Sequence, residues 1–141
     1  MENVDVVRAI EEAWASNDLD ALDQYFAPNW QPHTPGSDDI GNDLNVVKGA
    51  HQQSMQAFPD KQTKALDIIA EGDLVVSRVE MTGTNDGGLP WFGIPANGKK
   101  IDVEHITIYR LDGGKVAETW AQIEIPKMMQ QLGAMPAPEA M

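Results

Sequence analysis

The chain has 141 residues, and its 22 acidic residues against 10 basic ones give a net charge of −12 at pH 7. This charge disfavours nucleic acids and anionic membranes as partners, because both bind clustered lysine and arginine side chains. The sequence contains no cysteine, which removes disulfides, thiolate nucleophiles and cysteine-based zinc sites.

The length suits one domain. We expect residues 1–141 to form it, with a loosely held tail from about residue 134. The sequence has no run of about 18 apolar residues that could span a membrane. It begins with acidic residues and shows no secretory signal. Together with the lack of cysteine, these features predict a cytoplasmic protein.

The first part of the chain has the apolar spacing of helices. Residues 4–26 repeat apolar residues at intervals of three and four, with a break at residues 16–18, which predicts a helix, a turn and a short second helix. The proline-rich residues 27–36 predict an extended segment and loop, and another, polar loop is expected at residues 37–42. A third helix is expected over about residues 46–58, because a proline follows it.

Four segments rich in β-branched residues follow, each bounded by turn signals. They are Thr63–Ile69, Leu74–Thr84, Ile101–Leu111 and Val116–Ile125. The tight connection Asp112-Gly113-Gly114 predicts an antiparallel hairpin. Helices followed by strands is the order of α+β proteins, so we expect N-terminal helices packed on one face of a curved, mostly antiparallel sheet. A small-molecule pocket would then form between the helices and the sheet.

Several short motifs, in order along the chain, resemble those of one known family. They are His33 after the second helix, Phe58-Pro59-Asp60, Glu71-Gly72-Asp73, Gly83-Thr84, Gly93-Ile94-Pro95-Ala96-Asn97-Gly98, Tyr109-Arg110, Glu118-Thr119-Trp120 and Gln130-Gln131-Leu132-Gly133. With these motifs the chain is similar to the SnoaL-like polyketide cyclases, within the nuclear-transport-factor-two-like superfamily. The resemblance implies a cone-shaped α+β barrel of the cystatin-like type, a hydrophobic pocket between the helices and the sheet, and a homodimer formed through the sheet.

The resemblance also implies the position of an acid/base residue. In the polyketide cyclases of the family, an aspartate four residues after the tryptophan of the Glu-x-Trp motif is the catalytic acid/base. The matching residue here is Glu124, which is one methylene longer. Asn85 stands where the family's Gly-Thr-His motif has its histidine, so a neutral amide replaces a titratable group.

Glu124 and His33 are the candidate catalytic residues. Alternation along the last predicted strand puts Glu118, Trp120, Gln122 and Glu124 on one face. If Trp120 lines the pocket, Glu124 does too, and an apolar pocket raises the pKa of a carboxyl group toward a range useful for acid/base catalysis. A histidine side chain suits proton transfer at neutral pH, and the proline-rich segment around His33 can hold it at the pocket rim. The alternatives are a solvated Glu124 and a His33 bonded to a backbone carbonyl.

A second group of residues is expected to bind the substrate. It comprises Trp30, Met55, Phe58, Asn85, Trp91, Phe92, His105, Trp120 and Gln122. Trp91 and Phe92 lie in a glycine-rich loop that suits a flap over a ligand, although aromatic residues more often pack in a core or an interface. His105 lies within a strand and has a structural role as its alternative, and His51 is expected on an exposed helix face.

Metal ions and cofactors are not predicted. The three histidines are 18 and 54 residues apart, which matches no compact metal-binding motif. The sequence also lacks a phosphate-binding loop, a dinucleotide fingerprint and a nucleophile elbow. Arg78 or Arg110 is expected to pair with Glu118 in a structural network on the central strands.

These features favour a cofactor-independent acid/base enzyme that acts on a bulky, apolar or aromatic carbonyl compound. The reaction expected from the resemblance is an intramolecular aldol-type cyclisation or an isomerisation. Two alternatives remain open. One is water addition, as in epoxide hydrolysis or hydration, with Arg78, Glu80 and Glu124 activating the water. The other is a small-molecule binding protein without catalysis, since a fold of this kind can serve as a pocket alone.

Overall fold

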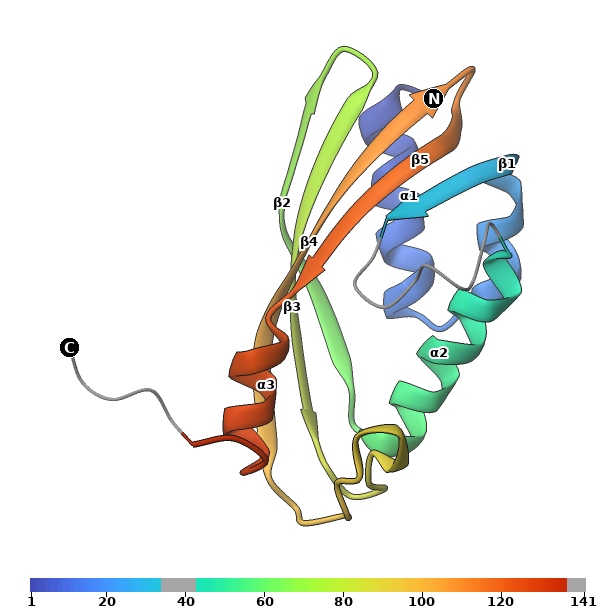
Figure 1. The fold of residues 1–141 in the computed structure, drawn as a ribbon. Helices are drawn as coiled ribbons and strands as arrows, with labels where there is room; N and C mark the ends of the chain where they lie inside the picture. The colour runs from blue at the N-terminus through green and yellow to red at the C-terminus, as the bar shows by residue number, and fades with distance from the viewer. Residues whose placement is uncertain (34–42, 137–141) are drawn as a thin grey trace, which may run out of the picture.

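The computed structural model describes residues 1–33 and 43–136, which form helices packed against a five-stranded sheet (Figure 1). The expected α+β architecture is confirmed. The expected loop at residues 37–42 and the end of the tail, residues 137–141, lie outside the described residues. Within the described ranges, no helix has the length and apolar character that a membrane span needs.

The sheet has the strand order β1-β5-β4-β3-β2. Its antiparallel part is a meander of β2 (Gln62–Glu71), β3 (Leu74–Thr84), β4 (Lys100–Asp112) and β5 (Lys115–Ile123). The four predicted strands and the hairpin between β4 and β5 are therefore confirmed. The long strands twist and curve toward the helices, as expected for a sheet of this kind (Figure 1).

The proline-rich segment, which the sequence predicts to be extended and then a loop, includes a strand of the sheet that the sequence does not predict. β1 (Phe26–His33) pairs in parallel with β5, and His33 lies opposite Trp120. β1 is one of the two edge strands of the sheet. Prolines are tolerated in such a strand, because an edge strand does not need every N–H for its ladder. Because proline disfavours most strand positions, Pro28 and Pro32 make this strand difficult to predict from the sequence.

The helices α1 and α2 lie on one side of the sheet (Figure 1). α1 (Asn3–Ala15) is followed by the 3₁₀-helix η1 (Leu19–Gln24), which confirms the predicted helix, turn and short helix. α2 (Leu44–Ala57) begins after Asp43, whose carboxylate accepts the backbone N–H of Asn45 at 2.9 Å. This bond satisfies one of the N–H groups left free at the helix start.

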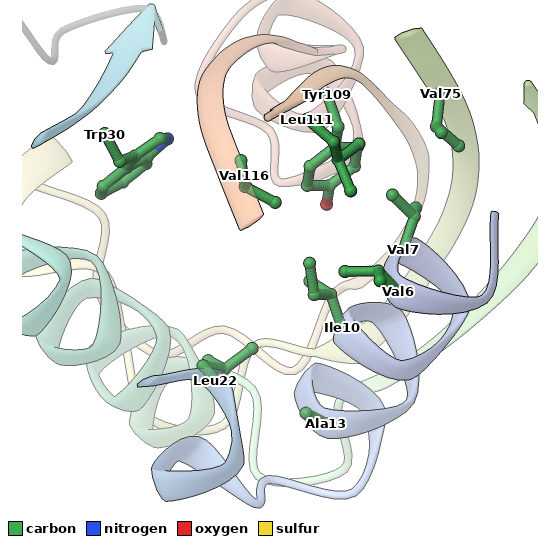
Figure 2. Packing of buried hydrophobic residues seen from close by; sticks show 10 residues of the cluster. All are labelled: Val6, Val7, Ile10, Ala13, Leu22, Trp30, Val75, Tyr109, Leu111 and Val116. Carbon is green, nitrogen blue, oxygen red and sulfur yellow. The ribbon is translucent and has the colours of Figure 1, made fainter. Parts of the chain in front are cut away.

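The helices pack on the sheet through a core of buried apolar residues (Figure 2). The members are Val6, Val7, Ile10 and Ala13 of α1, Leu22 of η1, Trp30 of β1, and Val75, Tyr109, Leu111 and Val116 of β3, β4 and β5. The spacing of the α1 residues places them on one helical face. Burying one such side chain contributes about 1.5–3 kcal/mol relative to exposure, so this core holds α1 against the sheet.

Strand pairing divides the side chains of the sheet between two faces, because paired residues of neighbouring strands point the same way. The inner face, which meets the helices, carries Val75, Ser77, Val79 and Met81 of β3, Val103, His105, Thr107 and Tyr109 of β4, and Thr119, Ala121 and Ile123 of β5. The outer face carries Arg78, Glu80, Glu104, Ile106, Ile108, Arg110, Glu118, Trp120 and Gln122.

A third helix follows β5, where the sequence predicts the end of a strand. β5 stops at Ile123, and α3 (Ile125–Gln131) covers the part of β4 that β5 leaves unpaired. Gln131 takes the place of a neighbouring strand: its Oε1 accepts the N–H of Asp102 at 2.9 Å, and its Nε2 donates to the carbonyl of Asp102 at 3.0 Å. The strand prediction overran here because Pro126, in the first turn of α3, starts a helix as readily as it ends a strand.

Candidate functional site

Glu124, the leading catalytic candidate, lies at the start of α3. Its Oε1 accepts the backbone N–H of Glu104 at 2.9 Å, and its Oε2 lies 3.6 Å from the Nζ of Lys127. The prediction that strand alternation carries Glu124 onto one face with Trp120 is wrong, because the strand ends at Ile123. The Glu124 carboxylate instead caps a backbone group at the edge of β4.

His33, the second candidate, belongs to a network on the outer face. Its Nε2 lies 2.7 Å from Oε2 of Glu118, and its ring stacks on Trp120 with centroids 5.4 Å apart. Glu118 also accepts a hydrogen bond from Nε of Arg110 at 3.2 Å, which confirms one of the two predicted pairs. The hydrogen bond with His33, and then that from Arg110, hold the pKa of Glu118 below its usual range. Gln122 shares this face with Trp120, as alternation predicts, but the face is opposite the helices.

The structure therefore separates the two catalytic candidates. His33 contacts Trp120 within β5, whereas Glu124 lies beyond the end of β5, at the start of α3. Their hydrogen-bond partners are different in the part of the chain that the structure describes.

Two of the predicted binding residues are core residues. Trp30 is 4% exposed, and its Nε1 donates to Oγ1 of Thr119 at 3.1 Å. Phe58 is 2% exposed and packs in a second core cluster with Met81 and side chains of α3. Met55 of α2 is half-buried. Trp30 and Phe58 therefore support the walls of the fold from within.

Asn85 holds together the loop between β3 and β4. Its side chain is fully buried. Its Nδ2 donates to the carbonyl of Pro95 at 3.0 Å and to Oδ1 of Asn97 at 3.1 Å, and its Oδ1 accepts the N–H of Gly88 at 2.9 Å. All three bonds stay within the loop, so the amide of Asn85 is engaged by the loop itself.

Trp91 and Phe92 project from this loop. They belong to the 3₁₀-helix η2 (Pro90–Phe92), are 48% and 46% exposed, and have ring centroids 6.3 Å apart. A bridge between Leu89 and Ile94 closes the loop beneath them. The pair is accessible to a ligand, and its role as a flap stays a prediction.

On the inner face, Glu11 of α1 accepts hydrogen bonds from two hydroxyl groups of the sheet. The Tyr109 hydroxyl donates to its Oε1 at 2.6 Å, and the Ser77 hydroxyl donates to the same atom at 2.9 Å. Figure 2 shows the Tyr109 hydroxyl on the side of its ring that faces α1. Burial raises the pKa of Glu11, and the two hydrogen bonds oppose this shift. Burial, and then the Glu11 carboxylate, raise the pKa of Tyr109 well above its usual range, so Tyr109 is a neutral donor.

A lysine–histidine pair lies where α2 leads into β2. The Nζ of Lys61 donates to Oγ of Ser54 at 2.7 Å and lies 3.3 Å from Nδ1 of His51. The His51 ring packs against Trp14 of α1, with centroids 5.0 Å apart. Burial lowers the pKa of Lys61 to about 8, and burial together with the Lys61 charge lowers the pKa of His51 to about 4. His51 is therefore neutral at pH 7, and the prediction that it lies on an exposed helix face is wrong.

His105 of β4 connects these two groups. Its Nε2 lies 3.2 Å from Oγ1 of Thr107, which is followed on the same face by Tyr109. Burial, and then the charge of Lys61, lower the pKa of His105. Polar side chains from α1, α2, β3, β4 and the segment between α2 and β2 thus follow one another along the inner face. We call this set the inner-face polar cluster; it comprises Glu11, His51, Ser54, Lys61, Ser77, His105, Thr107 and Tyr109.

This cluster has the chemistry of a proton-transfer site. Neutral imidazoles can take up protons, and a partly desolvated lysine can stabilise a negatively charged oxygen. Groups with shifted pKa values that face one another mark functional sites more often than chance, although structural networks share the property. In residues 1–33 and 43–136, no three histidine or acidic side chains are grouped so that they could hold a metal ion.

A cleft of about 350 Å³ opens between α1 and β2 beside the cluster. Its lining includes Arg8, Glu11, Glu12, Lys64, Asp67 and Val79. Val79 lies on the inner face of the sheet, and Glu11 bonds to Ser77 and Tyr109 of that face. The cleft therefore reaches the inner-face polar cluster between α1 and β2.

The sequence does not predict most of the inner-face polar cluster, and only part of the cluster has a recognisable signal in the sequence. Glu11 stands four residues after Val7 and one after Ile10, so it is a carboxylate beside the apolar stripe of a helix. A carboxylate buried at such a position destabilises the fold unless it accepts hydrogen bonds or pairs with a positive charge. Lys61 carries no such signal, because its contacts with His51 and Ser54 depend on how α2 meets β2.

Comparison with known proteins agrees with this fold. The model of the SnoaL-like polyketide cyclase family matches residues 4–132, and the chain belongs to that family. IdmH from Streptomyces antibioticus, described as a candidate polyketide cyclase, is 28% identical, with a TM-score of 0.82 over 94% of this chain and 99% of IdmH. A candidate polyketide cyclase from Acidithiobacillus ferrooxidans is also 28% identical, with a TM-score of 0.78 over 94% of this chain and 96% of that protein.

A third structure shares the fold at lower identity. AclR from Streptomyces galilaeus, described as a candidate hydroxylase, is 23% identical, with a TM-score of 0.81 over 97% of this chain and 84% of AclR. No curated protein matches the sequence.

Proposed function

We propose that this protein is a cofactor-independent acid/base enzyme that moves protons on a bulky, apolar carbonyl compound bound at the inner face. The reaction type is that of a polyketide cyclase, an intramolecular aldol-type cyclisation or a related isomerisation. The observation that carries the proposal is the position of His105, a half-buried imidazole with a lowered pKa that faces the helices beside Lys61.

His105 is the proposed base. Because its pKa is lowered, its ring is neutral at pH 7 and can take a proton from the carbon next to a carbonyl group. The enolate attacks a second carbonyl of the same molecule, a carbon–carbon bond forms, and the imidazolium returns its proton to the new alkoxide. Lys61 carries the positive charge that stabilises the negative oxygen during this sequence.

We assign the proton transfer to His105 rather than to Glu124 for a geometric reason. The Glu124 carboxylate is already engaged by the N–H of Glu104 and by Lys127. His33, likewise, is paired with Glu118 on the outer face. Both sets of contacts support structural roles for the two residues that the sequence favours.

The surroundings support an apolar, uncharged substrate. Apolar side chains on the inner face near His105 include Val79 and Ile123, which are its neighbours on β3 and β5. Trp14 adds an aromatic wall next to His51. The net charge of −12 opposes polyanionic ligands.

Proton exchange tests this proposal without knowledge of the natural substrate. The probe is 2-tetralone in deuterium oxide, with loss of the C–H signal next to the carbonyl followed by NMR. We expect the wild-type protein to accelerate the exchange over buffer and over an equal concentration of free imidazole. Exchange no faster than with free imidazole would contradict acid/base catalysis on this class of compound.

A binding protein without catalysis is the second candidate. It is favoured by one observation: Glu124 and Asn85, which stand at the family's two titratable positions, are both engaged in hydrogen bonds that hold the fold. Water addition is less well supported, because Arg78 bonds to Asp67 and Glu104 rather than to Glu124. Recovery of a ligand unchanged, and ¹⁸O from labelled water in a product, are the readouts that identify these alternatives.

We also propose that the protein forms a homodimer through the outer face. Four large apolar residues are exposed on this side of the sheet: Ile69, Leu74, Ile106 and Trp120. An exposed apolar patch with a charged rim is typical of a protein interface. The rim here contains the ion pairs of Arg78 and Arg110.

A further inference from the structure

One imidazole nitrogen of the inner-face polar cluster is buried without a partner. Nε2 of His51 is shielded from solvent and has no hydrogen-bond acceptor or donor among the described residues. Buried polar atoms in folded proteins are nearly always hydrogen-bonded, so an unpaired one calls for an explanation.

The other nitrogen of the ring determines what Nε2 carries. Nδ1 of His51 lies 3.3 Å from Nζ of Lys61. An ammonium group only donates hydrogen bonds, so Nδ1 must be the acceptor. A neutral imidazole has one N–H, and that hydrogen is therefore on Nε2.

The ring and the lysine are both held in place. Nζ of Lys61 also donates to Oγ of Ser54 at 2.7 Å, and the Ser54 hydroxyl donates to the backbone carbonyl of His51 at 2.6 Å. The Trp14 ring packs against the imidazole at an interplanar angle of 51°. These contacts fix the tautomer and the direction of the Nε2–H group before any ligand arrives.

We propose that the Nε2–H of His51 is the hydrogen-bond donor for a carbonyl, phenol or enolate oxygen of an apolar ring compound bound in the helix–sheet interior. Lys61 is its positioning residue: it accepts no proton in this role, but it sets the tautomer and places a positive charge behind the ring. The proposal rests on the inner-face site of the proposed function and adds the group that recognises the substrate oxygen.

A neutral donor suits this task. When a carbonyl oxygen becomes an enolate, a hydrogen bond from a fixed dipole strengthens without any rearrangement of solvent. The lowered pKa of His51, about 4, keeps the ring neutral through the physiological range. His51 then polarises the oxygen while His105, on the inner face of β4, handles the proton.

The tautomer is the first test. Long-range ¹⁵N–¹H NMR correlation of the histidine rings at pH 7 distinguishes Nε2–H, Nδ1–H and imidazolium forms. We expect His51 in the Nε2–H form in the wild type, and a mixture of tautomers in Lys61→Met. An Nδ1–H tautomer or an imidazolium at pH 7 in the wild type overturns the proposal.

Ligand binding is the second test, with 2-naphthol and naphthalene as probes. The two differ by one hydroxyl group, so the ratio of their affinities isolates recognition of the oxygen. We expect the wild type to prefer 2-naphthol and to lower the pKa of the bound naphthol. His51→Phe should lose about tenfold in 2-naphthol affinity, the size of one buried hydrogen bond, and keep its naphthalene affinity.

The control variant is Gln52→Ala, on the exposed side of the same helix, which should bind both probes as the wild type does. Equal affinity of the wild type for the two probes, or an equal loss for both in His51→Phe, overturns the proposal. Neither test involves turnover. A protein that binds the naphthol through His51 but exchanges no protons on 2-tetralone would therefore refute the proposed function and leave this inference standing.

Discussion

The imidazole of His33 stacks on the indole of Trp120, with ring centroids 5.4 Å apart and planes inclined by 16°, on the outer face of the sheet. The same imidazole pairs with Glu118 at 2.7 Å. The motif that contains Glu118 and Trp120 thus ties the edge strand β1 to β5. Its side chains point away from the helices, toward the apolar patch that we propose as the dimer interface.

Trp120→Glu should therefore convert a dimer into a monomer. A charge at this position would have to be buried without a partner in the interface. Sedimentation equilibrium measures the effect, and Trp91→Glu, which alters another exposed tryptophan away from this face, should remain dimeric. A wild-type protein that is monomeric at micromolar concentration, or a Trp120→Glu protein that stays dimeric, would contradict the proposed interface.

Asn85→Ala should destabilise the fold. The substitution leaves the N–H of Gly88 and the carbonyl of Pro95 without their buried partner, and we expect a loss of about 2–4 kcal/mol in the free energy of unfolding. Urea denaturation measures it. Asp86→Ala, at the next and exposed position, should change stability by less than about 0.5 kcal/mol. Equal stability of the two variants would mean that the loop does not depend on the amide.

Glu124 should behave as a cap. In Glu124→Gln the amide oxygen can still accept the N–H of Glu104, so stability should change little. Glu124→Ala removes the acceptor and should cost about 1 kcal/mol, measured by urea denaturation. If Gln and Ala destabilise equally, the carboxylate charge rather than the hydrogen bond to Glu104 matters.

Acid should destabilise the protein in part through His51. Its pKa falls from an ordinary 6.5 to about 4 on folding, so the unfolded chain binds a proton more readily. The stabilising contribution is complete above pH 6.5 and is lost as the pH falls through 4. Lys61, which contacts the ring, stays protonated throughout this window, and the pKa of His105, on the inner face of β4, shifts in the same direction.

His51→Asn isolates this effect, because the amide oxygen can still accept from Lys61. Between pH 7 and pH 4 the wild type should lose about 1–2 kcal/mol more stability than the variant, after allowance for partial solvent screening. Urea denaturation at a series of pH values measures the difference. Parallel pH profiles for the two proteins would show that His51 titrates normally.

Much of the fold follows from local patterns in the sequence. Alternation and turn residues predict β2 to β5, and helical spacing with Pro59 predicts α2. β1 was not predicted as a strand, because its prolines are also typical of a loop. Whether this extended segment joins a sheet depends on its pairing with β5, which is distant in the sequence. α3 was not predicted, because its apolar residues fit either the end of a strand or a short helix. Only the unpaired edge of β4, which α3 covers, distinguishes the two.

The site was harder to predict, because the sequence does not show which face of the sheet meets the helices. Alternation correctly places Glu118, Trp120 and Gln122 together, but it does not say which face meets the helices. Only the core around Val75 and Tyr109 identifies the inner face. The contacts of Lys61 with α2 arise from tertiary packing and leave no periodic trace in the sequence.

Exchange of 2-tetralone in deuterium oxide by two matched variants tests most directly whether proton transfer takes place at the inner face. His105→Asn keeps a polar side chain of similar size but removes the base, and its exchange rate should fall about 10²–10⁴-fold. Glu124→Gln should retain a rate within a few-fold of the wild type. The opposite pattern, with Glu124→Gln inactive and His105→Asn unaffected, would contradict the account and return the chemistry to the start of α3.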